Sequence, residues 1–146
     1  MNLPARRLFV AEPPAQYLVL PPLVVDCSTL AGLLFQEAWQ QQASARIQDK
    51  TLHAPYLLQV EITSVAAKKH KLGRPDVAAD GLLQYAEMHI ELHQIDPIAT
   101  LDLALRYQLS AYDAAYLWLA AELKAPLATF DEQLASAAKT HLATLA

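Results

Sequence analysis

The stretch Leu23-Val24-Val25-Asp26-Cys27-Ser28 decides the fold of this chain. Three apolar residues run directly into an aspartate, which is typical of a short buried strand in a parallel sheet. Ligand sites in open α/β sheets lie just beyond the carboxyl ends of the strands, so Asp26 stands where a site residue is expected. The aspartate would also suit a helix N-cap, although Ser28 or Thr29 could cap the helix expected to reach about Glu37.

Apolar runs and helical patterns alternate along the rest of the chain. Further strands are expected over 51–54, 90–95 and 127–129, with a last edge strand over 141–145, and helices over 39–47, 56–71, 76–88, 96–108, 110–124 and 131–138. Gly73 and Pro126 mark two of the breaks between them. This alternation predicts an α/β protein, a three-layer α/β/α sandwich around a mostly parallel sheet of four or five strands.

The chain of 146 residues has the length of one domain. Prolines at positions 4, 13, 14, 21 and 22 crowd its start, so residues 1–20 are expected to form an extension and residues 21–146 the folded domain. A content of 54% hydrophobic and 18% charged residues excludes a disordered chain.

Charge and cysteine content narrow the function classes. The net charge of −4 argues against a broadly basic nucleic-acid surface, but it leaves room for a local basic strip. The single Cys27 excludes an internal disulfide, and no Cys/His cluster indicates zinc, so a reducing compartment fits best. No apolar run approaches the ~20 residues that span a bilayer, and we expect a cytoplasmic protein without a membrane segment.

Glu61 is the most informative of the other acids. It lies within the apolar stripe of the helix expected over 56–71. Burying a carboxylate there is costly unless it is paired or bound to a cation. The alternative is that Glu61 reaches water, or pairs indirectly with Lys68.

Asp113 and Asp131 lie at expected helix starts. Asp113 follows Ser110 by three residues and Asp131 lies in Thr129-Phe130-Asp131-Glu132, so both also have a plain capping interpretation. Taken together with Asp26 and Glu61, they form an oxygen-only donor set, which selects a hard cation such as Mg²⁺ or Mn²⁺. Without a metal, carboxylates in one cleft would raise each other's pKa.

Four motifs in order resemble the PIN-domain family, in particular its VapC-type toxin ribonucleases. They are Val24-Val25-Asp26-Cys27-Ser28, the stretch from Pro55 to Glu61, Leu109-Ser110-Ala111-Tyr112-Asp113-Ala114-Ala115-Tyr116, and Leu127-Ala128-Thr129-Phe130-Asp131. The third is the most specific, and the resemblance covers about residues 22–138. The extension before Asp26 and the short segment after Asp131 depart from the family pattern.

The resemblance implies a five-stranded α/β/α fold and a metal-dependent endoribonuclease. It implies that RNA is the substrate, that the chain forms a homodimer, and that a small antitoxin protein is its partner. We expect Asp26 and Asp113 to ligate the main Mg²⁺ or Mn²⁺ ion, with Glu61 and Asp131 binding through water or holding a second ion.

Weaker expectations concern the surroundings of these acids. Ser28 and Thr129 could orient carboxylates or water, although plain capping is the alternative. The basic cluster Lys68, Lys69, Lys71 and Arg74 could bind RNA phosphates, or it could complement a helix C-terminus. His89 and His93 lie four apart, but residues 90–95 are expected to form a strand and the HExxH motif is absent, so the two are not expected to bind metal.

Two rival functions remain open. A non-catalytic PIN-like module would bind RNA or a protein without cleaving it. A haloacid-dehalogenase-type phosphatase would need a second aspartate where this chain has Ser28. A nuclease acting on DNA is also compatible, since nothing in the sequence reports on contacts to the 2′-hydroxyl.

Overall fold

Four parallel strands form the centre of the protein. The computed structural model describes residues 9–11, 13 and 20–145, so most of the expected extension lies outside the described residues. The strands are β1 (Pro22–Val25), β2 (Thr51–Pro55), β3 (Ile90–His93) and β4 (Leu127–Ala128), in the order β3-β2-β1-β4. All three pairings are parallel. Every strand therefore presents its carboxyl end at the same edge of the sheet.

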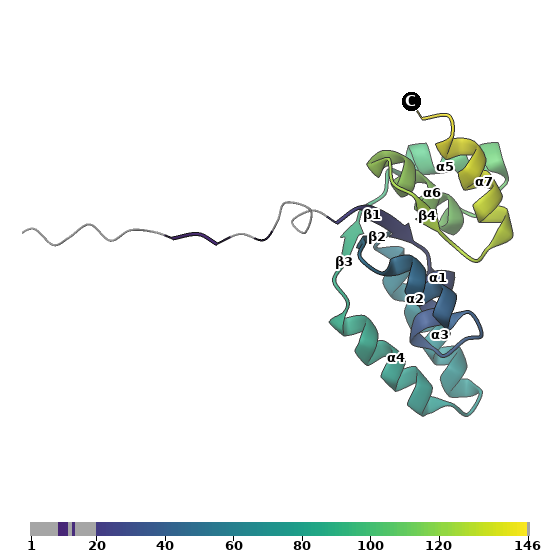
Figure 1. The fold of residues 1–146 in the computed structure, drawn as a ribbon. Helices are drawn as coiled ribbons and strands as arrows, with labels where there is room; N and C mark the ends of the chain where they lie inside the picture. The colour runs from purple at the N-terminus through teal and green to yellow at the C-terminus, as the bar shows by residue number, and fades with distance from the viewer. Residues whose placement is uncertain (1–8, 12, 14–19, 146) are drawn as a thin grey trace, which may run out of the picture.

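Seven helices within the described residues cover the two faces of this sheet (Figure 1). They are α1 (Cys27–Leu34), α2 (Gln40–Ile47), α3 (Leu57–Lys71), α4 (Pro75–Glu87), α5 (Pro97–Tyr107), α6 (Ala111–Leu123) and α7 (Glu132–Leu142). The first four lie together on one side and the last three on the other, which is the expected three-layer α/β/α sandwich. None of the helices described is long and apolar enough to cross a bilayer.

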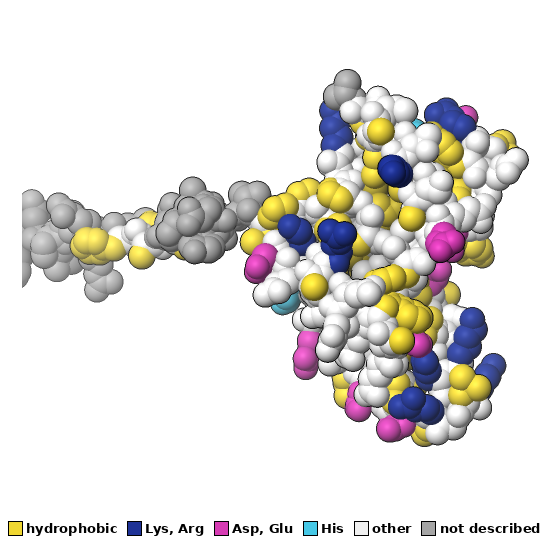
Figure 2. Space-filling view, turned by 45° about the vertical axis from the view of Figure 1, so that its right-hand side comes forward, with side chains coloured by type: hydrophobic (Ala, Val, Ile, Leu, Met, Phe, Trp, Pro, Cys, Tyr) yellow, Lys and Arg dark blue, Asp and Glu magenta, His cyan; other side chains and the backbone are white. Residues whose placement is uncertain are grey.

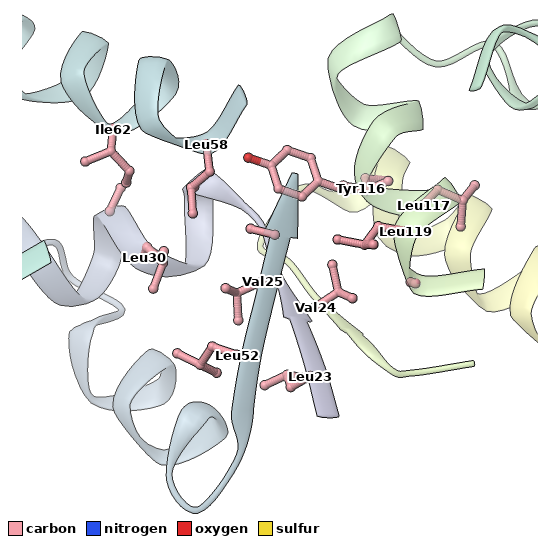
Figure 3. Packing of buried hydrophobic residues seen from close by; sticks show 14 of the residues in the cluster. Leu23, Val24, Val25, Leu30, Leu52, Leu58, Ile62, Tyr116, Leu117 and Leu119 are labelled. Atoms are coloured by element: carbon pink, nitrogen blue, oxygen red, sulfur yellow. The ribbon is translucent and has the colours of Figure 1, made fainter. Parts of the chain in front are cut away.

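Strand β1 joins the two halves of the core. Val24 and Val25 are both fully buried, and their side chains point to opposite faces of the sheet. Val25 lies on the side of Leu30 and Leu58, whereas Val24 lies toward Leu117 of α6 (Figure 3). A strand buried on both faces explains the unbroken apolar run that the sequence shows before Asp26.

Helix starts follow the polar residues seen in the sequence. Ser110 caps α6 by accepting a hydrogen bond from the Asp113 backbone N–H. Asp96 caps α5 in the same way, just before Pro97. At the start of α1, however, the cap is Asp26 itself and not Ser28 or Thr29, because α1 already begins at Cys27 and both hydroxyl residues lie inside its first turn.

The expected fifth strand over 141–145 is wrong. Helix α7 continues to Leu142, whose side chain packs against the core, and two turn residues follow. The helix thus uses the apolar residues that a strand would have buried, and the sheet described here has four strands. The outer edge of β4 consequently remains unpaired within the described part of the chain.

Candidate active site

The four candidate acids come from elements that meet at the carboxyl edge of the sheet. Asp26 follows β1 directly, and Asp131 follows the neighbouring strand β4 by three residues. Glu61 lies on α3, just after β2, and Asp113 lies in the first turn of α6. Parallel pairing therefore gathers four acids that are distant in sequence at one end of the fold.

Asp26 is held by a dense set of donors. It is 5% exposed, and its Oδ1 accepts from the Ser28 hydroxyl at 2.7 Å. The same oxygen accepts from the Thr29 backbone N–H at 3.0 Å and from the Thr29 hydroxyl at 3.1 Å. The Thr129 hydroxyl donates to Oδ2. These bonds fix the direction of the carboxylate.

Ser28 and Thr129 tie two loops together around that carboxylate. The Ser28 hydroxyl also accepts from the Phe130 backbone N–H at 2.9 Å, and the Thr129 hydroxyl accepts from the Asp131 N–H at 3.0 Å. The structure thus places both hydroxyls on Asp26, as expected for orienting groups, and neither caps a helix. The cap of α7 is Asp131, whose Oδ1 accepts from the Leu134 N–H.

Aromatic packing supports the loop after β1. The Trp39 indole N–H donates to the Ser28 backbone oxygen at 3.1 Å, and its ring lies 5.8 Å from that of Phe130. Gly32 allows this approach, because a Cβ at that position would lie 2.3 Å from the indole ring. Trp39 therefore supports the site indirectly, because its hydrogen bond fixes the backbone that carries Ser28.

Glu61 is paired with an unexpected partner. The Tyr116 hydroxyl donates to Glu61 Oε1 at 2.7 Å, whereas no ion pair with Lys68 is present within the described part of the chain. Tyr116 is 1% exposed, and in Figure 3 its hydroxyl points from α6 toward the helix that carries Leu58 and Ile62.

The carboxyl groups influence each other electrostatically. Burial raises the pKa of Glu61, the Tyr116 hydrogen bond opposes that rise, and the charges of Asp113 and Asp26 add to it. Burial likewise raises the pKa of Asp113, with further increases from Asp131 and Asp26 and a decrease from Ser110. All four acids thus belong to one electrostatic site, which stores like-charge repulsion.

The donor set fits a hard divalent cation, although the side chains do not enclose one as they stand. Within the described residues, no three acidic, histidine or cysteine side chains form a ready metal-binding group. The neighbouring Cys27 carries a half-buried thiol, whose pKa is raised to about 12 by burial and by the charges of Glu61 and Asp26. Oxygen ligands with unrelieved negative charge favour Mg²⁺ or Mn²⁺.

A groove lies along the unpaired edge of β4, and none of the four acids lines it. Its volume is about 1030 Å³, and Thr29 and Thr129, which bind Asp26, are among its lining residues. Three cations also line it: Arg46, Lys50 and Lys139. None of these three forms an ion pair with any residue that the structure describes.

The basic cluster that the sequence suggests for RNA binding lies at the end of α3. Lys68, Lys69 and Lys71 occupy the last turn of α3, and Arg74 follows it. Figure 2 shows dark blue side chains at this end of the molecule, where α3 passes into α4. Lys69 is already paired with Glu37 at 2.7 Å. Lys68 lies about 10 Å along the helix axis from Glu61, at 1.5 Å per residue.

Comparison with known sequences gives a consistent result. The PIN domain family matches this chain over residues 23–140. Ribonuclease VapC3 of Pyrobaculum aerophilum is 32% identical over 120 residues, which are 77% of this chain and 92% of that protein.

Solved structures show the same fold. The crystal structure of PAE2754 from Pyrobaculum aerophilum superposes with a TM-score of 0.63 at 25% identity, covering 86% of this chain and 95% of the other. VapC20 of Mycobacterium tuberculosis, a toxin that cleaves the sarcin-ricin loop, gives a TM-score of 0.59 at 12% identity, covering 79% and 94% of the two chains.

Proposed function

The chain belongs to the PIN-domain family, and from that premise we propose that it is a VapC-type toxin, an endoribonuclease that hydrolyses RNA phosphodiester bonds with Mg²⁺ or Mn²⁺. The observation that carries the proposal is the electrostatic coupling of four carboxyl groups at the carboxyl edge of the sheet. A nuclease needs such a set to hold a divalent ion against a phosphate.

We assign a role to each of the four acids. Asp26 and Asp113 would ligate the main ion, while Glu61 and Asp131 would act through bound water or hold a second ion. A bound divalent ion lowers the pKa of its water and neutralises charge that develops on the phosphate. Ser28 and Thr129 would hold the Asp26 carboxylate in a fixed orientation, since both donate hydrogen bonds to it.

Tyr116 would favour the ionised form of Glu61. Its hydroxyl donates to Glu61 Oε1, which lowers the pKa of the carboxyl group and partly offsets the rise caused by burial. An ionised Glu61 can orient a water molecule or receive its proton. Tyr116 is therefore a positioning residue, because it acts on the substrate only through Glu61.

The groove beside β4 would give the RNA strand its path. It begins at the hydroxyls that bind Asp26, and its three cations can bind successive phosphates. Phe130, at the mouth of the groove, is 40% exposed and offers a ring face for a base. The cluster of Lys68, Lys71 and Arg74 at the end of α3 is the alternative phosphate-binding surface.

Partners follow from the same assignment. We expect a small antitoxin protein, and a homodimer built on the apolar surface of α5. Ile98, Leu101 and Leu105 are 84%, 58% and 72% exposed there, and they repeat at helical spacing. A second copy covering these side chains would remove them from water. Function in the cytoplasm agrees with a single unpaired cysteine.

A cleavage assay tests the proposal. Purified chain is incubated with a mixed RNA pool in Mn²⁺ or in EDTA, and the ends of the products are sequenced. We expect cuts at defined positions in Mn²⁺ and none in EDTA. RNA that stays intact but is bound in both conditions would favour the non-catalytic module, and cleavage of DNA instead would correct the substrate.

A further inference from the structure

Two histidines that are not among the proposed site residues meet on neighbouring strands. The Nδ1 atom of His53 on β2 lies 2.9 Å from the Nε2 atom of His93 on β3. Their ring centroids are 5.2 Å apart and the ring planes are inclined by 36°. One ring N–H donates to the other ring's nitrogen, so at least one imidazole is neutral in this pair.

The register of the sheet explains the meeting. His53 is the partner of Glu91, and Pro55 is the partner of His93. Side chains alternate along a strand, so Glu91 and His93 lie on the same face of β3 as His53 does on β2. Both imidazoles are half-buried and Glu91 is exposed. Two nitrogen donors and one carboxylate therefore share a solvent-accessible strip of the sheet.

We propose that His53 and His93 form a two-nitrogen chelate for a borderline divalent transition metal, with Cu²⁺ or Ni²⁺ preferred. Metal–imidazole bonds are about 2.0–2.1 Å long, so two ligands at right angles stand about 2.9 Å apart. The observed separation of 2.9 Å equals that spacing. A right angle between nitrogens belongs to the tetragonal geometry of Cu²⁺ and Ni²⁺.

Binding requires only a small local change. The two rings now share a hydrogen bond, and each would turn so that its lone pair points to a common point outside the strands. Water would complete the coordination, and the exposed Glu91 carboxylate on the same face would balance part of the charge of the ion.

Proton competition at His53 is weak. Burial lowers the pKa of His53, His93 lowers it further, and the charge of Glu91 partly opposes the change. A neutral imidazole at neutral pH is the form that binds a metal. The nitrogen donors also separate this pair from the oxygen donors of the four acids, because imidazole favours Cu²⁺ and Ni²⁺ while carboxylates favour Mg²⁺ and Mn²⁺.

An ion at this position would clamp β2 to β3 next to the proposed active site. The Tyr56 backbone N–H donates to the His93 backbone oxygen at 3.0 Å, and α3 begins at the next residue. That helix carries Glu61. A metal that binds only the folded chain raises its unfolding temperature as its concentration increases, so binding can be followed without any activity measurement.

The test uses the full chain without a purification tag. Affinity for Ni²⁺ is measured by calorimetry in wild type, His53→Gln, His93→Gln and His89→Gln, and Cu²⁺ complexes of the same proteins are examined by electron paramagnetic resonance. Removing one arm of a chelate should weaken binding by about 10²-fold or more. His89 is exposed and has no part in the pair, so His89→Gln is the matched control.

The expected results are a loss of affinity in both His53→Gln and His93→Gln, an unchanged His89→Gln, and a copper spectrum with two nitrogen ligands only in wild type and the control. Circular dichroism confirms that each variant is folded. Equal affinity in all four proteins would overturn the proposal. So would a loss of Ni²⁺ binding in Asp26→Asn with Asp113→Asn, because the ion would then lie among the acids.

Discussion

Tyr116 on α6 donates its hydroxyl hydrogen to Glu61 on α3 at 2.7 Å, and so joins the two helical layers across the carboxyl edge of the sheet. The tyrosine is buried and the glutamate half-buried. Because the bond is made to a carboxylate, it affects both the ionisation of the candidate site and the packing of the layers.

Tyr116→Phe should preserve the packing of the core and change the pKa of Glu61. Without the hydroxyl, the pKa of Glu61 rises further above its ordinary value, since the hydrogen bond opposes the effect of burial. The acidic limb of the pH–rate profile should therefore move to higher pH, and stability should fall by about 1.5 to 3 kcal/mol. Tyr112→Phe, at an exposed tyrosine of the same helix, is the control and should leave the profile unchanged.

The Asp113→Asn variant tests how the carboxyl group of Asp113 affects the stability of the fold as a function of pH. The folded protein raises the pKa of Asp113, so it binds this proton more tightly than the unfolded chain does. The contribution of Asp113 to stability is therefore present at low pH and is lost as pH rises from its ordinary pKa through its raised folded value. Asparagine stays neutral at every pH, so the Asp113→Asn variant does not show this loss of stability.

The measurement is the free energy of unfolding in EDTA as a function of pH. The difference between Asp113→Asn and wild type should grow in favour of the variant as pH rises from about 4 toward neutrality. Asp80→Asn, at an exposed aspartate, is the control and should show no such trend. A variant that becomes relatively less stable with rising pH would show that Asp113 is not under like-charge repulsion.

Asp26→Asn should reduce both activity and stability. Asp26 accepts hydrogen bonds from Ser28, Thr29 and Thr129, and an amide nitrogen in place of one carboxylate oxygen leaves a donor facing a donor. We expect a cost of about 1 to 3 kcal/mol and a fall in cleavage of about 10²-fold or more. Denaturant unfolding and RNA cleavage report the two effects. Full activity in a folded variant would exclude Asp26 as a ligand.

The groove predicts where RNA phosphates bind. Replacing Arg46, Lys50 and Lys139 together by alanine should weaken RNA binding and reduce the salt dependence of the affinity, by about 0.7 in log–log slope for each phosphate that is no longer neutralised. The comparison set replaces Lys68, Lys71 and Arg74. If only this second set changes the slope, the RNA path follows the end of α3 and not the edge of β4.

The main elements were predictable from the sequence because their signals are local. An apolar run ending at Asp26 is a buried strand, and Ser110 followed by Asp113 marks the start of α6. The four acids could be proposed as one site because parallel strands end at a common edge. The PIN-domain assignment from four ordered motifs is confirmed by the family match over residues 23–140.

What escaped prediction depends on tertiary interactions. Tyr116 pairs with Glu61 across 55 residues, and His53 meets His93 across 40, separations over which sequence spacing carries no information. The strand predicted over residues 141–145 was wrong for another reason. Residues 141–145 are apolar enough for a strand, but the preceding helix had already placed Leu142 in the core.

Calorimetric titration with Mn²⁺ tests the central claim most directly, because the claim is that one divalent ion relieves the repulsion among these acids. Wild type should take up Mn²⁺ and release protons as it does so, and Asp113→Asn should bind at least about tenfold more weakly while remaining folded. Absence of Mn²⁺ uptake by folded wild type, or equal uptake by the variant, would contradict the proposed metal centre.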